Sequence, residues 1–216
     1  MKNKIAIVLS GCGVYDGTEI HEATMSMLAA DQAGAQYELF APDIDQHHVI
    51  NHLTGKPGEE TRNVLVESAR IARGKIRNLK DFNPAEFDAL LFPGGSGAVK
   101  NLSNYAFKGI EMSVNPAVEK AIKSMHAAGK PIGALCIAPV LLAKVIGGCN
   151  VTIGNDKDTA AHIEKMSAHH SSTNATGIVI DEKNKLVTTP CYMLGTRISE
   201  IYEGAAKVVT ELLKMM

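Results

Sequence analysis

The stretch that decides the fold is residues 129–139, which read Gly-Lys-Pro-Ile-Gly-Ala-Leu-Cys-Ile-Ala-Pro. Its apolar residues 132–135 predict a short buried strand, and residues 137–145 predict a helix that begins directly after Cys136. A cysteine at a sharp strand-to-helix corner is the arrangement of a nucleophile elbow. The strained backbone of such a corner requires small neighbours, and Ala134 and Ala138 meet that requirement.

Cys136 has two interpretations at this point. At the start of a helix, the free amides and the positive end of the helix dipole favour the thiolate, which would make Cys136 a nucleophile. A free cysteine at the end of a core strand is just as often a small buried residue without chemistry. The stretch alone does not separate the two, so the rest of the chain has to decide.

Composition narrows the class of protein. A chain of 216 residues that is 45% hydrophobic can bury one core, so we expect a single domain over residues 1–216. The formal net charge of -1, without a concentrated basic stretch, argues against nucleic-acid binding. The apolar run at residues 5–9 is too short for a signal-peptide core or a membrane span. Four cysteines without Cys-x-x-Cys spacing indicate free thiols in a reducing cytoplasm and no structural zinc.

Strand and helix patterns alternate along the chain. Strands are predicted at residues 4–9, 37–41, 87–92, 132–135, 151–153, 178–181 and 186–189, the last two joined by a hairpin turn. Helices are predicted from the N-cap Thr18 to Gly34 and at residues 59–73, 116–128, 137–145, 158–166 and 195–216. Such alternation predicts an α/β fold with a mainly parallel sheet, helices on both faces and a late β-hairpin.

Three loops leave carboxyl ends of the predicted parallel strands, where open α/β sheets bind ligands. They are residues 10–17, which contain Cys12, residues 93–97, and the corner at Cys136. The amide of Gly95, together with that of Ile137, is suited to binding a developing oxyanion, and Gly94 lies beside it. Glu22, early in the first helix, is near the same edge, although a helix glutamate is more often a solvated surface charge.

The histidines offer few bases for Cys136. His169 and His170 lie between a loop and a strand and are candidates for lining the pocket, as is Cys12. The group His47, His48 and His52 has no partner at a ligand spacing, so no metal site is predicted.

Six segments together resemble the PfpI-type branch of the class I glutamine-amidotransferase-like superfamily, most closely its ElbB subgroup. The segments are residues 9–22 (LSGCGVYDGTEIHE), 50–55 (INHLTG), 60–63 (ETRN), 93–102 (PGGSGAVKNL), 136–139 (CIAP) and 187–190 (VTTP). The fold that this resemblance implies is a flavodoxin-like three-layer sandwich.

The resemblance also implies a site. It pairs the elbow cysteine, Cys136, with a glutamate of the first helix, Glu22, which shares a proton with the sulfur and should have a raised pKa. The backbone amides of Gly95 and Ile137 would form the oxyanion pocket. The sequence departs from the family pattern at one position. Relatives with a histidine near the cysteine carry it where this sequence has Gly154, which argues against a Cys–His triad.

ElbB-like proteins are associated with weak, cofactor-independent glyoxalase activity. We therefore expect a cysteine-dependent enzyme that converts glyoxal, or a similar small dicarbonyl, to a hydroxy acid, without a cofactor and as a homodimer. The alternative is a thiol-based redox sensor that influences isoprenoid biosynthesis with little turnover. A glutaminase domain serving a partner is disfavoured by the missing histidine.

Overall fold

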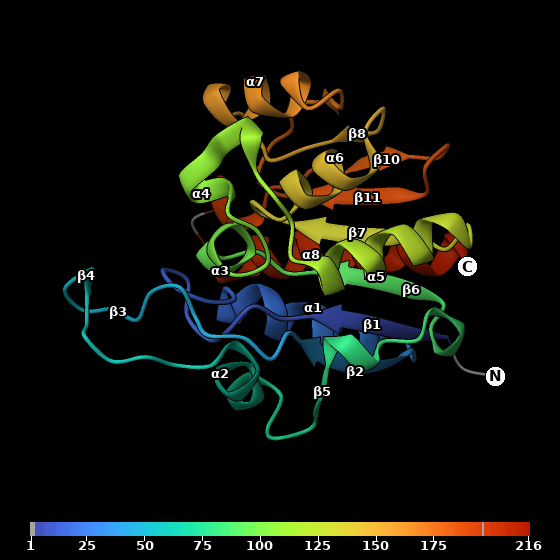
Figure 1. Ribbon diagram of the computed structural model, residues 1–216. Coiled ribbons are helices and arrows are strands. Elements are labelled where there is room, and N and C mark those ends of the chain that lie inside the picture. The colour runs from blue at the N-terminus through green and yellow to red at the C-terminus, as the bar shows by residue number, and fades with distance from the viewer. Residues whose placement is uncertain (1–2, 196) are drawn as a thin grey trace.

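The computed structural model describes residues 3–195 and 197–216 and has a seven-stranded sheet at its centre (Figure 1). The strand order is β10-β11-β7-β6-β1-β2-β5, and every neighbouring pair is parallel except β10 and β11. Helices cover both faces of this sheet, so the predicted three-layer α/β fold with a late hairpin is confirmed.

The strands of the central sheet are short. They are β1 (Lys4–Val8), β2 (Gln36–Ala41), β5 (Ile76–Asn78), β6 (Ala89–Phe92), β7 (Ile132–Leu135), β10 (Val179–Asp181) and β11 (Leu186–Thr189). Two small sheets lie outside it and consist of β3 (Ile50–Asn51) with β4 (Lys56–Pro57) and β8 (Asn150–Val151) with β9 (His169–His170). The β3–β4 hairpin projects from the body at the left of Figure 1.

The helices form the two outer layers. The α-helices are α1 (Ile20–Gln32), α2 (Val64–Ile71), α3 (Ser96–Lys100), α4 (Tyr105–Lys108), α5 (Pro116–Ala127), α6 (Pro139–Ile146), α7 (Lys157–Lys165) and α8 (Ile198–Met215). Single 3-10 turns are η1 (Leu79–Asp81), η2 (Pro84–Glu86), η3 (Gly109–Glu111) and η4 (Cys191–Met193). Helices α1, α2 and α8 pack on one face of the sheet, and α5 and α6 pack on the other.

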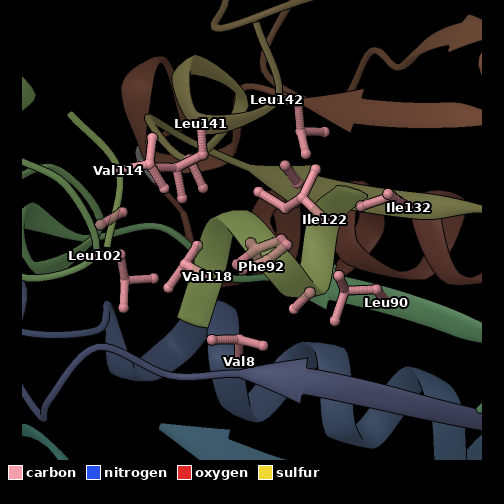
Figure 2. Close-up of a cluster of buried hydrophobic side chains, with 14 of the residues drawn as sticks. Val8, Leu90, Phe92, Leu102, Val114, Val118, Ile122, Ile132, Leu141 and Leu142 are labelled. Carbon is pink, nitrogen blue, oxygen red and sulfur yellow. The ribbon is translucent and has the colours of Figure 1, made fainter. Parts of the chain in front are cut away.

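Each central strand contributes to two cores because successive side chains of a strand point to opposite faces. In β1, Ala6 and Val8 join the cluster under α5 and α6, whereas Ile5 and Ile7 join the cluster under α1 and α8. Figure 2 shows the first cluster, with Val8 facing the side chains of α5 and β6. Burial on both faces explains why these strands read as continuous apolar runs.

Several predicted boundaries are wrong for local reasons. The first helix is capped by Glu19 and not by Thr18, whose hydroxyl instead accepts a hydrogen bond from the amide of Ser10 at 2.6 Å. The second helix starts only at Val64, because Asn63 caps it and accepts from the Val66 amide. The strand predicted at residues 151–153 pairs with β9 outside the main sheet, and edge strand β5 is too short and polar to be predicted.

The last helix begins later than predicted. It was expected over residues 195–216, and the structure has α8 from Ile198 to Met215, while Thr196 lies outside the described residues. Within the described part of the chain, no helix is both long and apolar enough to cross a membrane.

Candidate active site

Cys136 occupies the corner between β7 and α6 at the carboxyl edge of the sheet. Its φ angle is 59°, in the left-handed region that non-glycine residues avoid, so the corner is strained as predicted. The amide of Cys136 donates to the Thr189 carbonyl at 2.9 Å, which fixes the corner against the end of β11. Cys136 is only 7% exposed, so the sulfur is largely shielded from water.

Glu22 reaches this corner from the first turn of α1 and is fully buried. Its two carboxyl oxygens accept hydrogen bonds from two different loops. The Gly94 amide donates to Oε2 at 2.8 Å, and the Tyr192 amide donates to Oε1 at 3.2 Å. The carboxyl also shares a hydrogen bond with the Cys136 thiol. The interpretation of Glu22 as a solvated surface charge is therefore wrong.

Burial first, and the nearby Glu19 carboxyl second, raise the pKa of Glu22 to about 8, although hydrogen bonds with the Tyr192 and Gly94 amides and with Cys136 oppose the shift. Near neutral pH the carboxyl is therefore largely protonated and can donate a hydrogen bond to the sulfur. The direction agrees with the raised pKa that the family resemblance implies.

The Cys136 thiol is held by the Glu22 carboxyl and by hydrogen bonds from the backbone amides of Gly95 and Ile137. Burial nevertheless raises the pKa of Cys136 well above its usual value, and the Glu22 charge raises it further. The expectation that the helix start favours a resting thiolate is therefore wrong, because two amides do not offset the loss of water around the sulfur. The amides that were expected to bind an oxyanion are the ones that contact the sulfur.

Gly94 and Gly95 have different tasks. The Gly94 amide is engaged by Glu22, so it orients the carboxyl and is not free for a substrate. Gly95 has a φ of 93° and lies against the backbone before α1, and a Cβ there would come within 2.3 Å of the Glu19 nitrogen and 2.5 Å of the Gly17 oxygen. The loop after β6 can approach α1 this closely only because it lacks side chains.

Replacing Gly95 with alanine is expected to lower the free energy of unfolding by at least about 3 kcal/mol, because a rigid backbone clash adds to the strain of a positive φ. Urea unfolding at neutral pH measures this loss. Gly129→Ala is the matched control, since Gly129 has a φ of 65° and nothing within 4 Å of its Cβ position. It should cost only about 1 kcal/mol. Equal losses in the two variants would contradict the clash.

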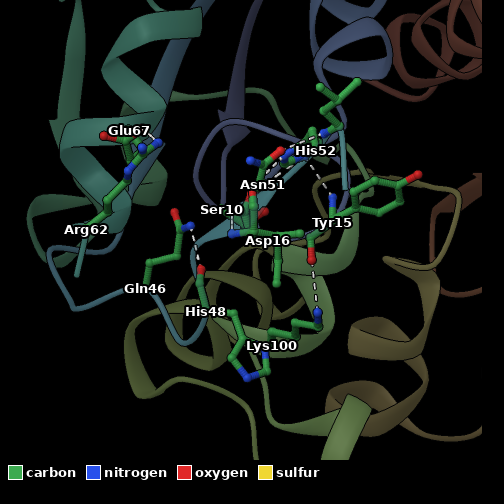
Figure 3. Close-up of polar contacts among 12 residues, drawn as sticks. Ser10, Tyr15, Asp16, Gln46, His48, Asn51, His52, Arg62, Glu67 and Lys100 are labelled. Carbon is green, nitrogen blue, oxygen red and sulfur yellow. Dashed lines mark hydrogen bonds and ion pairs between the residues drawn. The ribbon is translucent and has the colours of Figure 1, made fainter. Parts of the chain in front are cut away.

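Cys12 lies in the loop that follows β1. Its thiol is half-buried beside α2, and its pKa is raised by burial and by Glu67 while Arg70 opposes the shift. The loop that carries it is tied to the β3 segment, where Asp16 accepts from the Ile50 amide at 2.6 Å. Figure 3 shows Asp16 and Tyr15 of this loop close to Asn51 and His52. The part of the chain that the structure describes shows no hydrogen bond between Cys12 and Cys136, and the lining of the pocket by Cys12 stays a prediction.

His169 and His170 also have partners elsewhere. His169 pairs with Glu164 of α7 at 3.1 Å, and His170 Nε2 accepts from the Ile153 amide at 3.3 Å. Residues 3–195 and 197–216 show no hydrogen bond from either ring to Cys136 or Glu22. Gly154, where the resemblance implies a histidine in some relatives, has a φ of 99°, and a Cβ there would come within 2.8 Å of the Leu194 side chain. A histidine at this position would therefore be strained and would require Leu194 to move.

Two features that surround Glu22, the Glu19 carboxyl and the η4 turn, were not predicted from the sequence. Glu19 is 8% exposed, caps α1 by accepting from the Glu22 amide at 2.7 Å, and places a second carboxyl beside the first. The η4 turn supplies the Tyr192 amide and the fully buried Cys191, whose thiol lies near Glu22 and against α8. The sequence carried no local signal for η4, because its place at this edge follows from the parallel pairing of β11 with β7.

Other regions of the described structure are weaker candidates for a functional site. A broad hollow lies at the amino ends of β1 and β2, between α1 and α2, and it contains none of the residues described above. Among the described residues, no three His, Cys, Asp or Glu side chains gather closely enough to hold a metal ion. Cys136 and Glu22 therefore remain the candidate site.

This fold and elbow are those of a known family. The chain belongs to the DJ-1/PfpI family, whose model matches residues 13–191. A solved structure from Ehrlichia chaffeensis, described as an isoprenoid biosynthesis protein with an amidotransferase-like domain, is 33% identical with a TM-score of 0.91 over 99% of this chain and 100% of that one. Drosophila melanogaster DJ-1beta shares the fold at 18% identity, with a TM-score of 0.57 over 100% of this chain and 96% of its own.

Named relatives cover almost all of the chain. The rat "ES1 protein homolog, mitochondrial" and the human "Glutamine amidotransferase-like class 1 domain-containing protein 3, mitochondrial" are each 48% identical over 98% of this chain and over 84% and 83% of their own lengths. A zebrafish ES1 protein, also named mitochondrial, is 35% identical over 98% of this chain and 85% of its own. These names contradict the expectation of a cytoplasmic protein.

Proposed function

We propose that the chain is a cysteine-dependent, cofactor-independent glyoxalase that converts glyoxal, or a similarly small dicarbonyl, to a hydroxy acid. The observation that carries this proposal is the fully buried Glu22 carboxyl on the Cys136 thiol, with a pKa raised to about 8. Such a carboxyl can give and take protons near neutral pH, which is what an acid/base catalyst must do. The buried position of Cys136 favours a substrate as small as glyoxal.

The first step joins sulfur to one aldehyde carbon. The thiol proton passes through Glu22 to the aldehyde oxygen as the C–S bond forms, giving a hemithioacetal. The amides of Gly95 and Ile137, which lie at the sulfur, are placed to stabilise negative charge on that oxygen. Because the resting thiol is protonated, its proton must move as the bond forms.

The second step moves hydrogen between the two carbons. In its carboxylate form, Glu22 removes the proton from the carbon bonded to sulfur and returns it to the neighbouring carbon, while the hydroxyl proton of the first carbon passes to the oxygen of the second, which leaves a glycolyl thioester on Cys136. Water then cleaves the C–S bond to release glycolate and the thiol. Glyoxal and one water molecule give one glycolic acid, so no external oxidant or reductant is needed.

A likeness to ElbB proteins forms part of this proposal. It is supported by the structure from Ehrlichia chaffeensis, which is described as an isoprenoid biosynthesis protein and covers 99% of this chain. The same likeness favours the second candidate, a thiol sensor that affects isoprenoid output. In that case a hydroperoxide would oxidise Cys136 to a sulfenic acid and would itself be reduced to the alcohol, or to water if it is hydrogen peroxide.

The deciding experiment uses chromatography to measure the glycolate that forms from glyoxal. The reaction buffer contains a metal chelator and no added thiols. The enzyme proposal expects many turnovers per chain at a rate far above that of an equal concentration of free cysteine. A sensor would show no turnover above that background and would instead consume one hydroperoxide per chain. Absence of turnover with stoichiometric oxidation would overturn the glyoxalase proposal.

A further inference from the structure

The Tyr192 residue contacts α1 twice. Its backbone amide donates to Glu22 Oε1 at 3.2 Å, and its hydroxyl is 2.7 Å from Nδ1 of His21. Glu22 and His21 are adjacent on α1 but point in different directions around the helix, inward to the sulfur and outward to the rim. One residue of the η4 turn therefore reaches α1 from the inside with its main chain and from the outside with its side chain.

The η4 turn is under backbone strain at the point where it presents this amide. Cys191 has a φ of 42°, in the left-handed region, and its carbonyl accepts from the amides of Leu194 at 3.0 Å and Gly195 at 2.6 Å. These bonds close the turn on itself but do not join it to α1. The side-chain contact that joins the turn to α1 is the hydrogen bond between the Tyr192 hydroxyl and the His21 imidazole.

We propose that Tyr192 and His21 are positioning residues, which hold the η4 turn against α1 and so keep the Tyr192 amide on the Glu22 carboxyl. Neither residue reacts with substrate. The functional consequence rests on the proposed acid/base role of Glu22, but the contact itself does not.

The ionisable groups around Glu22 set its pKa, and this pKa is the property that the contact between Tyr192 and His21 affects. Glu19 faces it from the start of α1, Cys136 from the β7–α6 corner, and Cys191 and Tyr192 from η4. Burial and the Glu19 and Glu22 carboxyls raise the pKa of Tyr192, so its hydroxyl stays protonated, and it shares one hydrogen bond with His21 Nδ1 whose direction follows the imidazole tautomer. The Tyr192 amide favours the charged form of Glu22, and losing it must raise the pKa of Glu22.

The test follows the titration of Glu22 directly, without any aldehyde. The protein is labelled with glutamate carrying ¹³C at the side-chain carboxyl, and the Glu22 signal is identified by its absence from Glu22→Gln. In Tyr192→Phe and in His21→Ala we expect the pKa of Glu22 to rise by about one unit, the value of one hydrogen bond to a charged group. The double variant should show the same rise as either single variant, because both break one contact.

Two controls isolate this contact. His21→Asn keeps an acceptor near the position of Nδ1 and should restore the wild-type titration, although it removes the imidazole as His21→Ala does. Tyr202→Phe removes another hydroxyl that reaches α1, at Gln32, and should leave Glu22 unchanged. A wild-type titration in both Tyr192→Phe and His21→Ala overturns the proposal, as does His21→Asn behaving like His21→Ala.

The result is independent of the glyoxalase proposal. If Glu22 titrates higher in the variants and the wild type makes no glycolate, the proposed function fails and the positioning role stands. If glycolate forms but Glu22 titrates identically in every variant, the positioning role fails alone. Since His21 is exposed, His21→Ala should fold normally, and a thermal melt checks this.

Discussion

Cys136→Ala is expected to lower glycolate formation from glyoxal by at least about a thousandfold, to the background of the uncatalysed reaction. Without the sulfur no hemithioacetal forms on the protein, so Glu22 and the amides of Gly95 and Ile137 have no bound intermediate to act on. The variant should fold normally, because alanine removes only one atom from a side chain that is 7% exposed. Chromatographic detection of glycolate at saturating glyoxal measures the loss.

A second buried thiol provides the matched control for this experiment. Cys149 is 1% exposed, contacts the Leu142 carbonyl through its sulfur and has a pKa raised to about 12, mainly by burial. Cys149→Ala therefore removes a comparable thiol without touching the elbow, and its turnover should match the wild type. Comparable activity in Cys136→Ala and Cys149→Ala would show that glyoxal consumption reflects general protein chemistry and would contradict the proposed nucleophile.

Glu22→Gln is expected to change how stability depends on pH. Folding raises the pKa of Glu22 from 4.5 to about 8, so the folded state binds this proton more tightly than the unfolded state. The resulting stability is fully present below the unfolded pKa and is lost as pH rises through the folded pKa. Between pH 5 and pH 9 the wild type should therefore lose about 4 kcal/mol that Glu22→Gln does not lose.

Urea unfolding of both proteins at pH 5 and pH 9 measures this difference. The variant is expected to be the less stable protein at pH 5, because one oxygen of Glu22 is replaced by an amide nitrogen that cannot accept from Gly94 or Tyr192. Its disadvantage should shrink or reverse at pH 9. Parallel pH profiles for the two proteins would show that Glu22 titrates as an ordinary surface carboxyl and would contradict its buried, protonated state.

The sequence was sufficient for features set by local periodicity and local sterics. The apolar runs at β1, β6 and β7 identified strands buried on both faces, since few other environments accept such runs. The small residues around Cys136 predicted a strained corner, and the structure has a φ of 59° there. The pairing of Glu22 with Cys136 came from the family resemblance, because 114 positions separate them and periodicity carries no information over such a distance.

Only the tertiary structure decided the ionisation and the partners of the site. Local sequence predicted a thiolate at the helix start, but burial reverses that preference, and burial depends on all three layers together. Cys12 and His170 follow strands or loops that the sequence placed near the site, yet their partners lie at α2 and at residue 153. The Tyr192 amide reaches Glu22 only because the β10–β11 hairpin reverses the chain and brings β11 parallel to β7. Sheet pairing between distant segments, which no local pattern encodes, thus supplied the contact that holds the acid in place.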